Sequence, residues 1–248
     1  MTEQSPVLRH AGAEGRAGSR SSFDPVFQNF LLNPGQLPPL SSSALSADAL
    51  RARFQRELPW TPEALDGNPM RPESGQSRAS SVLIPLVMRP QGLQVLLTRR
   101  SEWLKHHAGQ ISFPGGRADP TDPDLLHTAL RETWEEIGVG ADHIQVLGRL
   151  PDHLTVTGFK VAPHIGLVHP AFDLRLDPAE VAEVFEVPLL HLMNPRHHRL
   201  HRISTAEARV RSYFSMPWHD YFIWGATAGM LRNLYHYLRA GEHPAPRT

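Results

Sequence analysis

The chain has 248 residues, and its 25 Lys and Arg balance 25 Asp and Glu, so the formal net charge is zero. It contains no cysteine, which excludes disulfides, cysteine-ligated metal centres and thiol catalysis. A neutral chain also lacks the basic excess of a general nucleic-acid or membrane-surface binder. With 40% apolar residues, the chain can bury a substantial core.

Targeting signals are not evident. No apolar run approaches the roughly 18 residues that span a bilayer. The N-terminal stretch MTEQSPVLRH lacks the apolar region of a signal peptide. We therefore expect a cytoplasmic protein that binds neither nucleic acid nor membrane; a homodimer is left open.

The first part of the chain is rich in Ser, Gly, Pro and Ala, and residues 33–39 read NPGQLPP. Prolines at this density neither continue a helix nor fit a central strand. We therefore expect residues 1–45 to form a largely disordered or extended arm. Within it, the aromatic and leucine residues of Phe23–Leu32 are candidates for docking on the core.

The rest of the chain is expected to form one folded domain. Residues 46–79 predict a helix at Ser46–Glu57 and a proline-rich lead-in. The domain itself is expected at 80–241, and a flexible tail at 242–248. No internal repeat or second linker interrupts this region.

Short apolar runs predict the first strands. Val82–Met88 and Leu93–Thr98 flank a Pro-Gly pattern at residues 89–92 that is typical of a type I turn. Pro85 cannot donate a ladder hydrogen bond, so it predicts a sheet edge or a bulge. Two further runs, His143–Leu150 and Phe159–Val168, also predict strands.

Two long helices are expected. Asp122-Pro123 predicts a helix start, with Asp as N-cap and Pro at the first helical position. This helix runs to Ile137, and Gly138 ends it. Apolar residues at helical spacing over Tyr221–Ala240 predict a last helix that ends at Gly241. Strands mixed with helices place the chain in the α+β class.

Three carboxylates share a narrow face of the first of these helices. At about 100° per residue, Glu132, Glu135 and Glu136 lie close together and repel one another. A divalent cation that prefers oxygen ligands, Mg²⁺ or Mn²⁺, would remove the repulsion. A solvated acidic face is the alternative interpretation. The upstream loop Phe113–Gly116 favours the cation, because its paired glycines let the backbone approach a ligand closely.

Gly116–Val139 resembles the Nudix box, GX5EX7REUXEEXGU with U aliphatic. The second half matches at Arg131, Glu132, Glu135, Glu136, Gly138 and Val139, with Thr133 at the first aliphatic position. The first half departs from the pattern: the spacing from Gly116 to Arg131 is one residue longer, and the upstream Glu is missing. The nearest acids are Asp119, Asp122 and Asp124, so the partner of Arg131 is left open.

The resemblance implies an α/β/α sandwich around a mixed β-sheet, and hydrolysis of a diphosphate linked to a nucleoside. The implied catalytic residues are Arg131, Glu132, Glu135 and Glu136. The implied ligands of Mg²⁺ or Mn²⁺ are Glu132, Glu135, Glu136 and the carbonyl of Gly116. A later loop often adds a carboxylate in this family, and Glu180 and Glu183 are equal candidates.

The segment Leu96–Gly116 resembles the signature of the coenzyme A pyrophosphatases of this family, LLTXR(S/A)X3RX3G followed by FPGG. Lys105 stands where the signature has Arg, which keeps the charge but loses the planar fork. The resemblance implies that substrate is bound by Arg99, Arg100, Lys105, His107, Gly109, Gln110, Phe113, Gly115 and Gly116. His106 and His107 are candidate proton donors, although adjacent loop histidines are more often solvated.

The function implied is metal-dependent hydrolysis of coenzyme A to 3′,5′-ADP and 4′-phosphopantetheine, with acyl-CoA derivatives as further candidates. One alternative is a Nudix hydrolase of another nucleoside diphosphate derivative, such as NADH or ADP-ribose. Another is a Nudix-like binding module without turnover. Charge segregation suits a polyanionic substrate: residues 117–136 hold six acids and two Arg, and residues 195–211 hold five Arg and one Glu. An exposed basic loop without a ligand is the other interpretation of residues 195–211.

Overall fold

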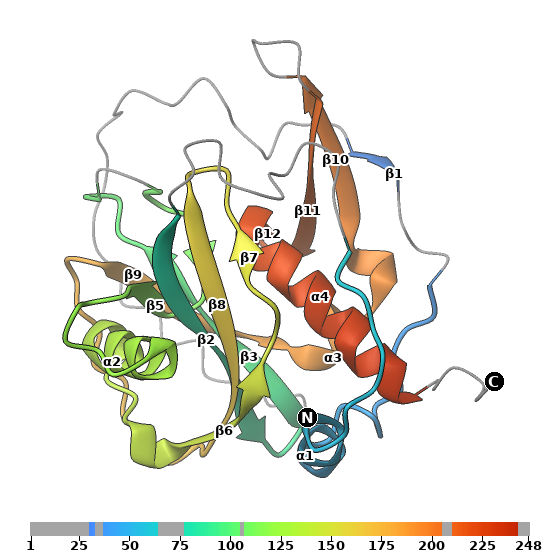
Figure 1. The fold of residues 1–248 in the computed structure, drawn as a ribbon, viewed down its shortest axis with the longest axis horizontal. Coiled ribbons are helices and arrows are strands. Elements are labelled where there is room, and N and C mark those ends of the chain that lie inside the picture. The colour runs from blue at the N-terminus through green and yellow to red at the C-terminus, as the bar shows by residue number, and fades with distance from the viewer. Residues whose placement is uncertain (1–29, 33–36, 64–76, 105–106, 205–209, 243–248) are drawn as a thin grey trace, which may run out of the picture.

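The computed structural model describes residues 30–32, 37–63, 77–104, 107–204 and 210–242 (Figure 1). The helices are α1 (Ala47–Phe54), α2 (Leu125–Ile137), α3 (Leu189–Leu192) and α4 (Gly225–Glu242), with short 3-10 turns at Ala141–His143 and Pro195–His197. The strands are β1 (Phe30–Leu32), β2 (Arg78–Arg89), β3 (Gly92–Arg100), β4 (Ile111–Ser112), β5 (Gly115–Arg117), β6 (Ile144–Arg149), β7 (His153–Leu154), β8 (Phe159–Val168), β9 (Val181–Pro188), β10 (Arg199–Ser204), β11 (Val210–Trp218) and β12 (Tyr221–Trp224).

The main sheet has the strand order β4-β3-β2-β8-β6, with β5, β7 and β9 paired to β2, β8 and β3. Strands β2 and β8 are parallel and the other pairs are antiparallel, so the sheet is mixed. Figure 1 shows α2 on one side of this sheet and α4 on the other. The predicted α/β/α sandwich around a mixed sheet is therefore confirmed.

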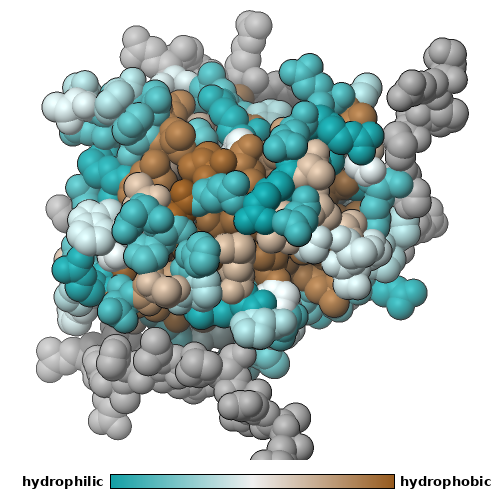
Figure 2. All heavy atoms as spheres, turned by 90° about the horizontal axis from the view of Figure 1, so that it is seen from below, coloured by the Kyte–Doolittle hydropathy of each residue, from teal (hydrophilic) through white to brown (hydrophobic). Residues whose placement is uncertain are grey.

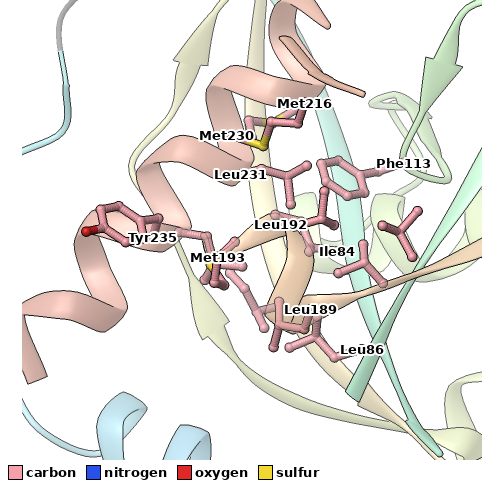
Figure 3. Close-up of a cluster of buried hydrophobic side chains, with 14 of the residues drawn as sticks. Ile84, Leu86, Phe113, Leu189, Leu192, Met193, Met216, Met230, Leu231 and Tyr235 are labelled. Atoms are coloured by element: carbon pink, nitrogen blue, oxygen red, sulfur yellow. The ribbon is translucent and has the colours of Figure 1, made fainter. Parts of the chain in front are cut away.

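Side-chain alternation along the strands explains the two layers. On β2, Ile84 and Leu86 belong to a large core shared with α4, and Figure 3 shows Met230, Leu231 and Tyr235 of that helix in the same cluster. Val87 instead packs with Ile137 of α2 in a second, smaller core. The central strands are apolar on both faces because each face is covered by a helix.

Pro85 lies in a central strand, so the expected sheet edge is wrong. It stands opposite Gly166 of β8 in the parallel pair. On its other side, β2 pairs with β5 as far as Val82 and with β3 from Leu86. The missing N–H of Pro85 thus falls where β2 changes its antiparallel partner, and no ladder bond is needed there.

A second sheet, ordered β1-β10-β11-β12, was not predicted. The expected helix over Tyr221–Ala240 is wrong at its start, because Tyr221–Trp224 forms β12 against β11. Gly225, at φ +64°, then turns the chain into α4. The helix continues through Gly241 to Glu242.

The stretch 195–211 is not simply a basic loop. Its described part forms a 3-10 turn, β10 and the first residues of β11. His198 and His201 are buried, while Arg196, Arg199 and Arg202 are exposed. This segment therefore contains buried histidines next to exposed arginines, and only part of it belongs to β10.

The chain ahead of residue 80 contributes to the same core. Helix α1 is confirmed, with Ser46 capping it by accepting a hydrogen bond from the Ala49 N–H. Leu40, Leu45 and Leu50 belong to the large core, so the boundary expected at residue 80 does not separate two cores.

Most of the expected N-terminal arm lies outside the described residues. Within it, Phe30–Leu32 pairs antiparallel with β10 as β1, so this part of the expected docking segment joins the fold. The expected tail begins too early, because Glu242 belongs to α4 and accepts a hydrogen bond from the Ser41 N–H at 3.0 Å. No helix in the described part of the chain is long and apolar enough to cross a membrane.

Figure 2 views the molecule from below and shows an area of apolar side chains framed by polar and charged ones. The large apolar side chains with the greatest exposure are scattered over separate elements: Trp103, Trp134, Val156, Leu190 and Val210. Single exposed apolar side chains are ordinary on a protein surface. Exposure by itself therefore does not assign a binding role to any of them.

An ionic cluster ties the lead-in to α4. Glu63 Oε2 accepts hydrogen bonds from Arg232 Nε at 2.5 Å and His236 Nε2 at 2.7 Å. Arg232 also donates to His198 Nδ1 at 3.0 Å, and its side chain is buried. Burial alone would raise the pKa of Glu63, but the hydrogen bonds from His236 and Arg232 outweigh it and lower this pKa to about 2.

Glu63→Gln is expected to lower the free energy of unfolding at pH 7 by on the order of 2 kcal/mol. The carboxylate has a lower pKa in the folded state than its ordinary 4.5, so its contribution is present above about pH 4.5. That contribution disappears as the pH falls through about 2. Denaturant unfolding at several pH values measures it. Glu57→Gln, at an exposed position nearby, is the control. Equal behaviour of the two variants at pH 7 would contradict the prediction.

Candidate active site

Two glycines of strand β5 lie in close contact with β2 and α2. Gly115 adopts φ +148°, and a Cβ at this position would lie 2.4 Å from the Ser81 carbonyl oxygen. A Cβ on Gly116 would lie 2.4 Å from the carboxyl carbon of Glu132 on α2. Only glycine fits at position 115, whereas a side chain at position 116 would displace the Glu132 carboxylate. The paired glycines thus bring the β5 backbone into contact with the carboxylates of α2. The close approach to a ligand or metal stays a prediction.

Glu136 is the most buried carboxylate of α2, with a side chain only 4% exposed. Its Oε2 accepts the Gly115 N–H at 3.2 Å, and Arg100 Nη1 lies 3.9 Å from its Oε1. Burial raises the pKa of Glu136 to about 8, opposed by the Gly115 hydrogen bond and the charge of Arg100, and reinforced by Glu180 and Glu132. A buried carboxylate with so little compensating charge fits a cation as its partner.

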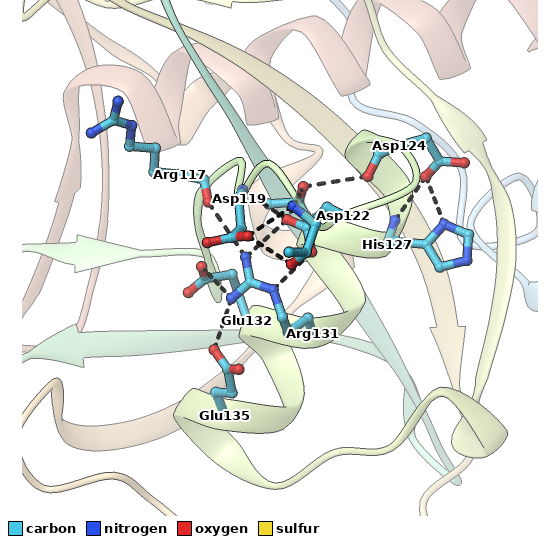
Figure 4. Close-up of polar contacts among 10 residues, drawn as sticks. Arg117, Asp119, Asp122, Asp124, His127, Arg131, Glu132 and Glu135 are labelled. Carbon is cyan, nitrogen blue, oxygen red and sulfur yellow. Dashed lines mark hydrogen bonds and ion pairs between the residues drawn. The ribbon is translucent and has the colours of Figure 1, made fainter.

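Arg131 organises the exposed end of the acidic face (Figure 4). Its Nε and Nη2 donate to the two carboxylate oxygens of Asp122 at 2.9 and 3.0 Å. Its Nη1 donates to Glu132 Oε1 and to Glu135 Oε2, both at 2.8 Å. The hydrogen bonds from Arg131 hold the pKa of Asp122 well below its usual range. Asp122 is therefore the acid that pairs with Arg131, which the sequence left open.

The expected N-cap at Asp122 is wrong. Helix α2 begins at Leu125, and its cap is Asp124, whose carboxylate accepts the His127 N–H at 2.9 Å. The Asp122 carboxylate is occupied by Arg131, and it also accepts the Asp119 N–H and the Thr128 hydroxyl. A sequence signal for this role existed: Asp122 is the sixth residue after Gly116, where the box places its upstream acid. The additional residue therefore lies between Asp122 and Arg131.

The three glutamates of α2 share one face but do not form a compact cluster. Glu135 is drawn outward by Arg131, and its side chain is more than half exposed. Burial raises the pKa of Glu132, an effect that Arg131 opposes and that Glu135 and Glu180 reinforce. Within the described ranges, no three His, Asp or Glu side chains converge closely enough to form a metal site. Glu132 and Glu136 are therefore the carboxylates that best fit a cation, together with the adjoining Gly116 backbone.

The structure distinguishes the two later carboxylates. The charge of Glu180 raises the pKa values of both Glu132 and Glu136, and its backbone carbonyl accepts the Ser101 N–H at 2.8 Å. Glu183 is engaged elsewhere, with Arg99 Nη2 at 3.0 Å and the Tyr221 hydroxyl at 2.5 Å. Glu180 is thus the later carboxylate whose charge acts on the glutamates of α2.

The adjacent arginines at the end of β3 have different partners. Arg100 lies beside Glu136, whereas Arg99 pairs with Glu183 of β9. Successive strand residues point to opposite faces, although an irregularity interrupts the β3–β9 register between these two positions. Of the two, only Arg100 is placed against a carboxylate of α2.

The other expected substrate residues lie in the loop after β3 and in the strand that follows. Lys105 and His106 are outside the described residues. His107 hydrogen-bonds Gln110 through Nδ1 at 2.8 Å and has φ +59°, and a Cβ on Gly109 would meet the Glu102 carboxylate at 2.6 Å. The expectation that Phe113 binds substrate is wrong, because its side chain is 2% exposed and lies in the large core (Figure 3). It anchors the glycine loop and presents no side-chain surface to a ligand.

Two open cavities lie along the outer side of α2. One, of about 480 Å³, is lined by residues that include Asp122, His127 and Trp134, and the other, of about 370 Å³, includes Glu135 and Arg175. Trp134 borders both, and the guanidinium of Arg175 lies 4.7 Å from the centre of its ring. These cavities adjoin Arg131 and Glu135, not Glu136.

Asp122→Asn is expected to lower turnover roughly 10- to 100-fold, because Arg131 loses the partner that aligns it with Glu132 and Glu135. The thermal unfolding temperature should also fall, since the amide cannot accept both guanidinium hydrogen bonds. Asp119→Asn is the matched control, because within the described ranges the Asp119 carboxylate accepts hydrogen bonds from nearby Thr121 and none from Arg131. Steady-state kinetics of both variants test this, and equal rates for the two would contradict the assigned role.

Comparisons with known proteins agree with this geometry. A family model described as NUDIX domain matches residues 77–211. A protein named "Uncharacterized Nudix hydrolase NudL" from Photorhabdus laumondii subsp. laumondii is 39% identical over 182 residues, 73% of this chain and 92% of the relative. A relative of the same name from Klebsiella pneumoniae subsp. pneumoniae is 40% identical over 207 residues, 83% of this chain and 100% of the relative.

Among solved structures, a C. elegans Ap4A hydrolase binary complex matches with a TM-score of 0.40 and 19% identity, over 44% of this chain and 80% of that chain. This similarity is too low to support an argument. The family model, by contrast, covers more than half of the 248 residues, and the match includes β5 and α2 with all three glutamates. The chain therefore belongs to the Nudix hydrolase family.

Proposed function

We propose that this Nudix hydrolase cleaves the diphosphate of coenzyme A to give 3′,5′-ADP and 4′-phosphopantetheine, with acyl-CoA derivatives as further substrates. The observation that carries the proposal is the segment Leu96–Gly116. It resembles the coenzyme A pyrophosphatase signature, and it runs from β3 to the glycine loop beside α2. Within it, Arg100 lies 3.9 Å from Glu136, so the signature and the box meet at one place.

Positive and negative side chains lie next to each other there, so a phosphate can be attracted by the first and a cation by the second. Arg100 supplies a guanidinium beside the buried Glu136, and Glu180 adds its negative charge to those of Glu132 and Glu136. A diphosphate cannot approach these carboxylates without a cation between them, because like charges repel strongly at low dielectric. A bound Mg²⁺ or Mn²⁺ would polarise the phosphoryl oxygens and lower the pKa of an attacking water.

The protein residues then have distinct roles. Glu132, Glu136 and the Gly116 carbonyl would hold the cation, and the Gly115 N–H keeps Glu136 in place. Arg131 orients Glu132 and Glu135 and is itself held by Asp122. Arg100 would attract a phosphate oxygen, while Arg99 is already paired with Glu183. The Lys105 role stays a prediction, because this residue is outside the described ranges.

A second candidate is hydrolysis of another nucleoside diphosphate derivative, such as NADH or ADP-ribose. The arginine and glutamates of α2 would act on the diphosphate of these substrates in the same way. A binding module without turnover is less well supported, because Arg131 and all three glutamates are present and Arg131 contacts two of the three.

Product analysis with coenzyme A, acetyl-CoA, NADH and ADP-ribose at equal concentrations, with Mg²⁺ or Mn²⁺, tests the proposal. We expect kcat/KM for coenzyme A or acetyl-CoA to exceed that for NADH and ADP-ribose by at least about tenfold, which corresponds to about 1.4 kcal/mol of discrimination. Chromatography should show 3′,5′-ADP and the matching phosphopantetheine. A preference for NADH or ADP-ribose would favour the second candidate, and no turnover of any compound would favour the binding module.

A further inference from the structure

Trp103 is the most exposed large apolar side chain described, at 87%. In the described part of the chain, no aromatic ring or cation is recorded against its indole, whereas Trp134 carries Arg175 over its ring. A fully solvated indole leaves a large apolar surface in water. Its two preceding neighbours in the sequence are polar: Glu102 is exposed and Ser101 is buried. It therefore has the form of a contact for one flat group.

The turn that carries Trp103 is tied to the active site. Leu104 donates its N–H to the Ser101 carbonyl at 3.3 Å, which closes a β-turn with Trp103 at its third position. The Ser101 hydroxyl accepts the Trp103 N–H at 3.4 Å. Ser101 in turn donates its N–H to the carbonyl of Glu180, whose charge acts on Glu132 and Glu136. The base of the turn is thus fixed to the residue whose charge acts on the α2 glutamates.

The short chain distance between Trp103 and Arg100 also places the turn near the candidate active site. Trp103 follows Arg100 by three residues, so their Cα atoms are within about 11 Å even if the chain were extended. Arg100 contacts Glu136. Backbone hydrogen bonds from Arg100 to Gln110 and from Gly109 to Arg100 close the loop at its base. The backbone of Trp103 is therefore close to Arg100, the residue beside Glu136, and its exposed indole is available to a group attached to a diphosphate there.

We infer that Trp103 stacks on the nucleobase of the bound nucleoside diphosphate. This inference rests on the proposed function for its substrate class, and it adds the residue that recognises the base end. A ribose separates the diphosphate from the base, which places a flat π-face a short distance from the phosphates. The pantetheine end is a flexible amide chain with no such face. Base–aromatic stacking changes affinity roughly 5- to 150-fold and tolerates different bases.

The two halves of the proposed substrate provide the test. 3′,5′-ADP carries the base, and 4′-phosphopantetheine carries a phosphate without a base. With the full chain and Mg²⁺, Trp103→Ala should weaken binding of 3′,5′-ADP about tenfold by calorimetry and leave 4′-phosphopantetheine unchanged. Trp103→Phe should retain binding within about threefold, because a benzene ring still stacks. Leu190→Ala, at another exposed apolar position, is the control and should bind both fragments like the original protein.

Spectroscopy separates stacking from a structural effect. Binding of 3′,5′-ADP should quench tryptophan fluorescence in the original protein, and this quenching should largely vanish in Trp103→Phe, whose fold and affinity are kept. Unchanged affinity for 3′,5′-ADP in Trp103→Ala would overturn the inference. Equal weakening of both fragments, or weakening of 4′-phosphopantetheine alone, would also overturn it.

Failure of the proposed function gives a different pattern. If coenzyme A is not hydrolysed but 3′,5′-ADP still binds in a Trp103-dependent manner, the inferred base contact is supported and the proposed substrate is refuted. If coenzyme A is hydrolysed and Trp103→Ala has no effect on either fragment, the substrate assignment stands and the base contact falls.

Discussion

Glu136→Gln is expected to reduce cation-dependent turnover roughly 10²- to 10³-fold. The substitution keeps the size and shape of a side chain that is only 4% exposed, but removes its charge. Glu136 is the carboxylate that the Gly115 N–H fixes and that Arg100 approaches. A cation held by this carboxylate would therefore lose one of its ligands. Steady-state rates over a range of Mg²⁺ concentrations measure the effect.

Unfolding measurements show whether the lost activity reflects the cation site or the fold. Burial disfavours the charged form of Glu136, so a neutral amide should be tolerated. Without divalent cations, the two proteins should unfold within about 2 °C of each other. Added Mg²⁺ should stabilise the original protein more than Glu136→Gln, since a ligand stabilises the state that binds it. Unchanged Mg²⁺-dependent turnover in the variant would refute the assignment of Glu136 as a cation ligand.

Gly116→Ala is expected to lower turnover by about 10²-fold with little loss of stability. The new methyl group would lie 2.4 to 2.6 Å from the carboxylate atoms of Glu132. Because that group is the end of a side chain, it can move aside, and the carboxylate would then leave the proposed cation site. Rates and thermal unfolding of the same preparation test both parts of the prediction.

Gly115→Ala is the matched variant one residue earlier, and it should behave in the opposite way. Its methyl group would meet backbone atoms, at 2.4 Å from the Ser81 oxygen and 2.6 Å from the Val82 Cα, and the residue has φ +148°. Backbone cannot move aside cheaply, and such φ values cost a side-chain-bearing residue about 1–3 kcal/mol. The unfolding temperature should therefore fall by several degrees. If both variants lose stability equally, the separate roles of the two glycines are refuted.

Local features of the site were predictable from the sequence. The three glutamates share a face because helical geometry is the same in every α-helix. The glycine pair indicated close backbone approach because glycine alone lacks a Cβ. The box and the signature then indicated the family. These features depend on neighbours within a few residues, so no knowledge of the fold was needed.

Features that depend on distant partners were missed. Asp122 followed by proline has the local pattern of an N-cap, but its carboxylate is bound by Arg131, nine residues later. Tyr221–Trp224 continues the helical pattern of α4, but it pairs with β11. In each case an interaction outside the local window outweighed a local preference of at most about 2 kcal/mol.

The zero net charge argues against a general nucleic-acid or membrane-surface binder, yet it says nothing about how the charges are placed. The sequence by itself determined which residue types are available: an acidic helix face, a glycine pair and adjacent arginines. Only the tertiary structure decided that Arg100 faces Glu136 while Arg99 faces Glu183, that the charge of Glu180 acts on Glu136, and that Phe113 lies in the core. The physical reason is that charge and burial act through space, and strand pairing sets which side chains meet.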